Sequence, residues 1–293
     1  MSHHMNMNVK PKSRARKVVS YVFSFFLALD TMAIALLVVL NMGLFSERSL
    51  ISALDETYYT YVKDYIETQA EYYTLPTGIK ASVLDEVFTL EDIQINTNRI
   101  ITNSINGNSF TPDVSKEREK LLANVKASFA TDGVETAEGT EADAVADSYV
   151  DEIMKIYTDA LKIPGLDAIS NVQNGFSKAF PIALVALILL AVAFVLIIVR
   201  LHHYLHRSLR YVAYACGGAS LMLLVVPAII QVSGFYYGLH LEPQYFYYFV
   251  VSMIERILRL TLIAGAVMAA ASVVVAMICG ALRQGVSSGH RRS

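Results

Sequence analysis

Four long apolar runs dominate the hydrophobic pattern of the chain. They cover residues 18–45, 179–200, 211–234 and 260–282, and within them only Asp30 and the terminal Arg200 carry a charge. A helix needs about 20 apolar residues to cross the hydrocarbon core of a bilayer, which is ~30 Å thick. The first run is too long for a signal peptide, whose apolar region takes about 7–15 residues. The pattern predicts an all-α integral membrane protein with four transmembrane helices.

The stretch 46–178, between the first two runs, has the mixed pattern of water-exposed helices. Its apolar residues recur three and four positions apart, which is the spacing of amphipathic helices. Turn residues such as Pro76, Gly107 and Pro164 separate the segments. We expect helices over residues 50–73, 81–88, 91–105, 111–129 and 141–161, with Thr111 as the cap of the fourth. The first and last helices of this inserted domain should continue the first and second spans.

Charge divides the chain in the same places. The stretch 46–178 holds 23 Asp and Glu against 11 Lys and Arg, a net charge of −12, whereas the rest holds 3 against 13, a net charge of +10. Basic residues gather in the segments 1–17 and 283–293 and in the hairpin 201–210. The positive-inside rule places these three segments in the cytoplasm. The helical domain 46–178 and the segment 235–259 are then extracytoplasmic.

Cysteine usage adds to this assignment. The chain has two cysteines, Cys216 and Cys279, and both fall within apolar runs. The inserted domain has none, so disulfides do not stabilise it, and it has no Asn-x-Ser/Thr acceptor for glycosylation. These features favour the plasma membrane of a bacterium over a eukaryotic secretory route.

Aromatic and small residues mark two further features of the membrane segments. Eight aromatic residues lie between Phe235 and Phe249, as in the aromatic belt of a membrane interface. Small residues four apart, such as Ala213 with Gly217 and Gly265 with Ala269, predict close helix packing in the third and fourth runs.

Asp30 is the one acidic residue within the apolar runs. It lies near the middle of the first run, where a carboxylate costs about 2.5 kcal/mol or more, and such residues often serve a function. Three interpretations remain open: a proton or cation relay, an anchor for a partner helix, or a protonated carboxyl bonded to Ser220 or Ser272.

A second polar group is expected where the chain leaves the membrane. Glu255 and Arg259 lie four apart on one helix face, and Arg256 lies beside them. Glu47 follows the first run at the same expected depth. An ion pair between Glu47 and these arginines is one interpretation. The alternative is a site for an anion or a lipid headgroup.

Tyrosines are unusually frequent at the start of the inserted domain. Tyr58, Tyr61, Tyr65 and Tyr72 lie on one expected helix, and tyrosine combines a large contact area with a polar tip. These residues form either a binding surface or part of the core.

No catalytic motif is present. The chain lacks the HExxH motif, the nucleophile elbow and the P-loop. His202, His203 and His206 have helical spacing, but their loop has no carboxylate or thiol to complete a metal site. We expect no enzyme activity, cofactor, metal or nucleic-acid partner.

The preferred hypothesis is a non-enzymatic membrane protein whose extracytoplasmic domain binds a partner or ligand or scaffolds an envelope complex. Besides the lipid bilayer, its partner would be another membrane or envelope protein or a second copy of the chain. The alternative is a transporter or channel, or a permease-type subunit for a separate ATPase, that uses Asp30.

Overall fold

The computed structural model describes residues 11–108, 110–134, 139–202 and 205–289. The chain is 85% helix, and no strand occurs in the described residues, so the prediction of an all-α protein is confirmed. Contacts divide the chain into two compact units. We call one the apolar unit (Met1–Gly43, Lys178–Phe235 and Glu255–Ser293) and the other the acidic unit (Leu44–Ser177 and Tyr236–Ile254).

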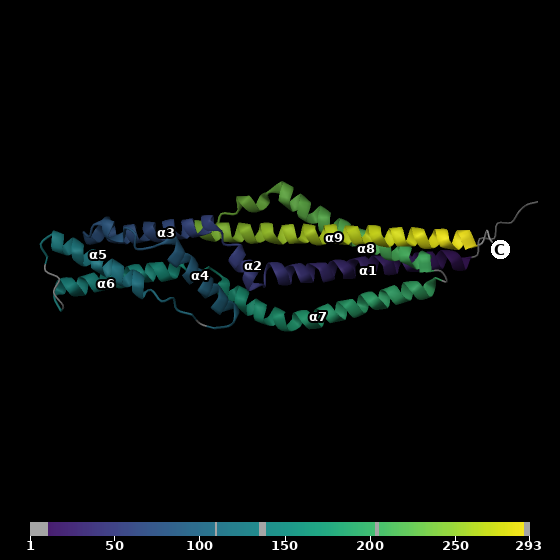
Figure 1. The fold of residues 1–293 in the computed structure, drawn as a ribbon, viewed down its shortest axis with the longest axis horizontal. Helices are drawn as coiled ribbons and strands as arrows, with labels where there is room; N and C mark the ends of the chain where they lie inside the picture. Colours follow the sequence, from purple (N-terminus) through teal and green to yellow (C-terminus); the bar gives the residue numbers. More distant parts are fainter. Residues whose placement is uncertain (1–10, 109, 135–138, 203–204, 290–293) are drawn as a thin grey trace, which may run out of the picture. The chain divides into compact units, whose positions relative to one another are not determined.

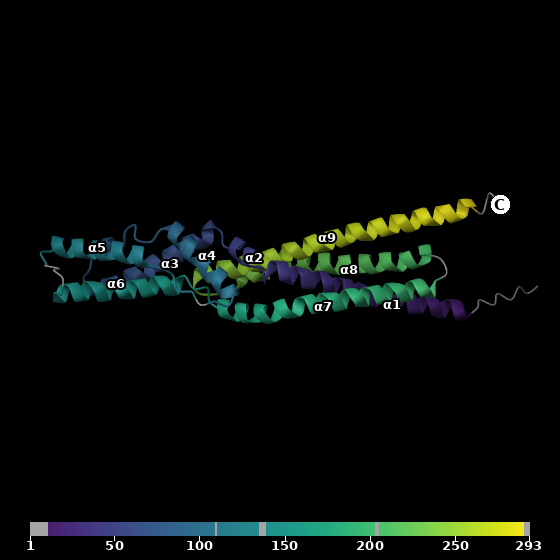
Figure 2. The ribbon, with the colours of Figure 1, turned by 60° about the horizontal axis from the view of Figure 1, so that its bottom comes forward.

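Four helices are long and apolar enough to cross a membrane, as the apolar runs predicted. They are α1 (Pro11–Gly43), α7 (Leu166–Leu201), α8 (Leu205–Ser233) and α9 (Gln244–Gly289). The first turns of α7 and α9 belong to the acidic unit and the remainder of both helices to the apolar unit. Within the apolar unit, α1 and α8 lie side by side (Figure 2).

Small and hydroxylated residues bring the helices of the apolar unit together. Ser24 of α1 donates a hydrogen bond through Oγ to the Tyr211 carbonyl oxygen of α8, at 2.8 Å. A Cβ atom placed on Gly265 of α9 would lie 2.8 Å from Leu224 Cγ of α8. Only glycine allows this approach, which agrees with the close packing predicted from the small residues.

The acidic unit is a helical domain with its own hydrophobic core. Figure 1 shows α3 (Glu56–Thr74), α4 (Leu90–Ile105), α5 (Ser115–Thr131) and α6 (Glu141–Ala160) gathered in this unit. The shorter elements are α2 (Glu47–Ser52), η1 (Leu75–Thr77), η2 (Ala81–Leu84) and η3 (Phe235–Gly238). The core takes buried side chains from several helices, including Leu50, Ile66, Ile93, Leu121, Ile153 and Phe249.

Caps explain where several helices begin. The side chains of Asp55, Thr89 and Thr140 each accept a hydrogen bond from the backbone N–H three residues later. Such caps satisfy backbone donors that the first turn of a helix leaves unpaired. These local caps therefore set the first residues of α3, α4 and α6.

Three sequence-based expectations about the helices are wrong. The single helix over residues 50–73 is two helices, because Asp55 caps a new start. Thr111 is no cap, since α5 begins at Ser115. Of the segment 81–88, only Ala81–Leu84 is helical.

The expected continuity of the domain with its flanking spans holds at one end only. The first helix does not extend the first span, because α1 ends at Gly43 and α2 begins at Glu47. At the other end the expectation is confirmed, since α7 runs without a break from Leu166 to Leu201.

Candidate functional site

Most of the tyrosines on α3 take part in packing. Tyr58 is buried in the core, and its ring meets that of Tyr245 on α9 edge to face, with ring centroids 6.0 Å apart. Tyr61 stacks on Tyr248 at 4.4 Å, and the two hydroxyl groups are hydrogen-bonded at 3.0 Å. Tyr65 also contacts Tyr245, at 5.3 Å. These three tyrosines therefore hold α3 against the first turns of α9 inside the acidic unit.

The end of α3 differs from the rest of the helix. Thr74 and Tyr149 of α6 share a hydrogen bond of 2.7 Å between their hydroxyl groups, which fixes this end of α3. Beside that anchor, Tyr72 and Leu75 are each 66% exposed, and Tyr73 is partly exposed. We call Tyr72, Tyr73 and Leu75 the α3 tip. Of the four tyrosines singled out in the sequence, Tyr58 is buried, Tyr61 and Tyr65 are half-buried, and Tyr72 alone is exposed. Whether it binds one stays a prediction.

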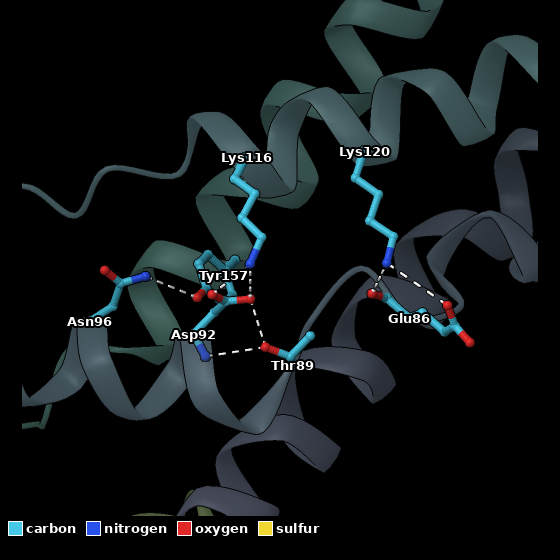
Figure 3. A network of polar contacts seen from close by, with 7 residues as sticks. All are labelled: Glu86, Thr89, Asp92, Asn96, Lys116, Lys120 and Tyr157. Atoms are coloured by element: carbon cyan, nitrogen blue, oxygen red, sulfur yellow. Dashed lines mark hydrogen bonds and ion pairs between the residues drawn. The ribbon is translucent and has the colours of Figure 1, made fainter.

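A polar network links α4 to α5 (Figure 3). Lys116 donates to both carboxylate oxygens of Asp92 at 2.9 Å, and Thr89 donates to Oδ2 at 2.6 Å. Partial burial alone would raise the pKa of Asp92, but these hydrogen bonds outweigh it, and the pKa lies below its ordinary value. Asp92 is therefore held as a carboxylate.

A second carboxyl group near this network has its pKa shifted in the opposite direction. Glu117 of α5 is 3% exposed, and its Oε2 has no hydrogen-bond partner among the described residues. Burial raises the pKa of this carboxyl, and the nearby charge of Asp92 adds to the effect. The phenol of Tyr157 in α6, bonded to Asn96 of α4 at 3.3 Å, is fully buried as well. Glu117, Asn96 and Tyr157 thus lie in the core, where they join α4, α5 and α6.

An open groove of about 510 Å³ lies between the η2 turn and α5. It includes Glu86, whose φ of 58° is in the left-handed region that non-glycine residues rarely adopt. Lys120 supports this backbone by donating to the Glu86 carbonyl oxygen at 2.6 Å, as Figure 3 shows. Lys80, also in the groove, pairs with Asp132 at 2.6 Å. Lys80 and Lys120 are therefore already bonded to other groups of the acidic unit.

Asp30 is buried in the apolar unit. It is 5% exposed, and none of the described residues donates a hydrogen bond to either carboxylate oxygen. The partners considered from the sequence are engaged elsewhere. Ser220 donates to the Gly217 carbonyl oxygen at 2.8 Å, and Ser272 donates to the Ala213 carbonyl oxygen at 3.0 Å.

The residues of the expected ion pair belong to different units. Glu47 lies in the acidic unit, where its Oε1 accepts a hydrogen bond from Thr102 at 2.7 Å. Glu255, Arg256 and Arg259 lie on the part of α9 that belongs to the apolar unit. The ion pair between Glu47 and these arginines, and the alternative anion or lipid site, both stay predictions.

The described residues contain no group of three or more His, Cys, Asp and Glu side chains that could hold a metal ion. His202 contacts Ser20 at 2.9 Å and stacks on Tyr211. His203 and the side chain of His206 lie outside the described part of the chain.

Comparison of the chain with protein-family models, curated proteins and solved structures finds no match.

The sequence did not single out Leu75, Asp92 or Glu117. The sequence pattern around Asp92 could have indicated its role. Thr89, three positions earlier, is a typical helix cap, and a polar residue three positions after such a cap often pairs with it. For Glu117 no signal existed, since it lies in the charged segment Lys116 to Lys120, which is typical of an exposed helix face.

Proposed function

We propose that the chain is a non-enzymatic docking protein of a bacterial plasma membrane. Its acidic unit would lie outside the cytoplasm and bind a basic protein of the cell envelope through the α3 tip. The observation that carries the proposal is the 66% exposure of both Tyr72 and Leu75 beside an anchored helix end.

The location outside the cytoplasm is supported by charge. The basic segments 1–17, 201–210 and 283–293 all belong on the cytoplasmic side by the positive-inside rule. With four spans, that arrangement leaves the stretch 46–178 on the other side of the membrane.

The α3 tip has the composition of a protein contact. Tyrosine is enriched among residues that dominate binding energy, and a large apolar neighbour excludes water from such contacts. The hydrogen bond between Thr74 and Tyr149 holds the tip before binding, so little conformational entropy is lost when a partner docks.

The charge of the stretch 46–178 selects the partner. Its net charge of −12 repels a second copy of the same domain and the anionic lipids of a membrane surface. A protein with a basic surface is attracted instead. Such attraction speeds association and weakens as salt is added.

Photo-crosslinking in native membranes tests this proposal. A photoreactive amino acid is placed at Leu75 in the full chain, and a matched chain carries it at Ile95, an apolar residue of α4 that is 41% exposed. We expect a crosslinked envelope protein with a basic surface at position 75, absent at position 95. Its yield should fall several-fold in high salt and in the variant Tyr72→Ser.

Three results would contradict the proposal. They are crosslinks of equal yield at positions 75 and 95, crosslinks at position 75 to a second copy of the chain or to lipid alone, and a yield that neither salt nor Tyr72→Ser lowers.

A further inference from the structure

The carboxyl group of Asp30 has surroundings that suit only its neutral form. Both oxygens are inaccessible to solvent and lack a hydrogen-bond partner among the described residues. Asp30 lies in a helix that is apolar enough to cross a membrane, so lipid rather than water surrounds this part of α1.

The face of α1 that carries Asp30 packs on apolar side chains. Phe23, Leu27 and Asp30 lie on one helix face, because their spacings are four and three residues. Phe23 meets Phe194 of α7, with ring centroids 6.0 Å apart, and Leu27 belongs to a buried cluster with Ile198 of α7 and Ala215 of α8. In α7, residues 179–199 contain no polar side chain that could pair with Asp30.

The two serine hydroxyl groups that could pair with Asp30, on α8 and α9, are also committed. A serine has a single hydroxyl hydrogen, and those of Ser220 and Ser272 are donated to backbone oxygens of α8. On α1 itself, Thr31 donates to the carbonyl oxygens of Leu27 and Ala28, within its own helix.

Among the described side chains of the apolar unit, no charged group lies at the level of Asp30. Along α1 the nearest is Lys17, 13 residues away, which corresponds to roughly 20 Å at 1.5 Å per residue. On α9, Arg259 precedes Leu260, and Leu260 packs at Gly43, which is 13 residues from Asp30 in the other direction. The other described titratable side chains of the apolar unit are Arg16, Tyr21, Lys178, Arg200, His202, Arg207, Arg210, Tyr211, Tyr214, Cys216, Glu255, Arg256 and Cys279.

From this geometry we infer that Asp30 is an intramembrane proton-binding site, occupied by a proton at neutral pH. An ionised carboxylate here would have neither water nor a counter-charge. Release of the proton therefore requires water to enter between α1 and its neighbours α7 and α8. Proton occupancy is thus coupled to the packing of α1, a property independent of any partner that the acidic unit binds.

Infrared spectroscopy of the full-length protein in liposomes tests the occupancy. The spectrum of Asp30→Asn is subtracted from that of the natural chain, which removes the signal of every other carboxyl group, Glu117 included. We expect a protonated carboxyl band at about pH 7, where an ordinary aspartate is ionised. The band should shift on labelling with carboxyl-¹³C aspartate and persist in the control Glu255→Gln.

Two results would overturn the inference: no protonated carboxyl band at about pH 7 in the difference spectrum, or a band that aspartate labelling leaves unshifted. Should Asp30→Asn fail to fold, Asp30→Glu replaces it: its protonated band should no longer shift on aspartate labelling, which assigns the band of the natural chain to position 30.

A separate experiment tests whether proton occupancy of Asp30 is coupled to the packing of α1. A Cβ atom on Gly218 would lie 3.6 Å from Ala28 Cβ, which is within disulfide range, so the pair Ala28→Cys and Gly218→Cys reports contact between α1 and α8. With the two natural cysteines replaced by serine, we expect disulfide formation to slow as pH rises, relative to the same pair combined with Asp30→Asn. Equal rates in the two backgrounds at every pH would contradict the coupling.

Discussion

Both units are helical, but their apolar side chains differ in how far they are exposed. In the acidic unit, Phe88, Ile153 and Tyr157 are almost completely buried. In the apolar unit, Ile182 of α7 is 73% exposed and Val232 of α8 is 89% exposed. The first unit is stabilised by removing apolar surface from water. The second has helices apolar enough to cross a membrane. In lipid it would gain nothing from burying apolar surface and would rely on close packing and hydrogen bonds between helices.

The largest expected effect comes from core truncation in the acidic unit. Ile153→Ala should lower the free energy of unfolding of this unit by about 2–5 kcal/mol, because it leaves a cavity in a closed core. Ile182→Ala, at an exposed site of the apolar unit, should change stability by less than about 0.5 kcal/mol. Hydrogen exchange of α6 and α7 amides in the full chain in nanodiscs measures both. Equal effects would remove the distinction between the units.

A smaller effect is expected from filling a helix contact in the apolar unit. Gly265→Ala places a methyl group 2.8 Å from Leu224 Cγ and should cost about 1–3 kcal/mol, because the helices must separate. Gly280→Ala is the matched control on the same helix, since no atom lies within 4 Å of its new methyl group. Thermal unfolding in micelles, followed by circular dichroism, should show a lower Tm for Gly265→Ala alone. A lower Tm for both variants would argue against a specific contact.

The smallest effect is a pH dependence within the acidic unit. The pKa of Glu117 is raised in the folded state by burial, so the folded state holds this proton more tightly than the unfolded state, in which the pKa is near 4.5. Stability should therefore fall as pH rises from 4.5 through the raised pKa, and Glu117→Gln should remove this fall. Glu119→Gln, at an exposed site of the same helix, should leave it unchanged.

Asp92 should give stability the opposite pH dependence to that given by Glu117. Its pKa is lowered in the folded state, where the hydrogen bonds from Thr89 and Lys116 outweigh the effect of burial, so its contribution is present above pH 3.8 and is lost as pH falls. Asp92→Asn should reduce stability at neutral pH. Denaturant titrations of the full chain at several pH values test both carboxyl groups, and the same sign for both would refute the assignment.

The four helices that are apolar enough to cross a membrane could be predicted from sequence, because they form long uninterrupted apolar segments. The break before α3 could not, since Leu50, Leu54 and Tyr58 keep helical spacing across it and only the cap at Asp55 marks the start of the second helix. The roles of the tyrosines could not be predicted from sequence either, because Tyr61 stacks on Tyr248, a residue 187 positions away.

Labelling of introduced cysteines in intact cells tests the central claim most directly, which is that the acidic unit lies outside the cytoplasm. Glu119→Cys of α5 and Arg207→Cys of the hairpin, each in a chain without its natural cysteines, are treated with a membrane-impermeant maleimide. Both sites are exposed. We expect labelling at position 119 in intact cells and at position 207 only after the cells are opened. Labelling at position 207 but not at position 119 in intact cells would contradict the proposed topology and the docking function that depends on it.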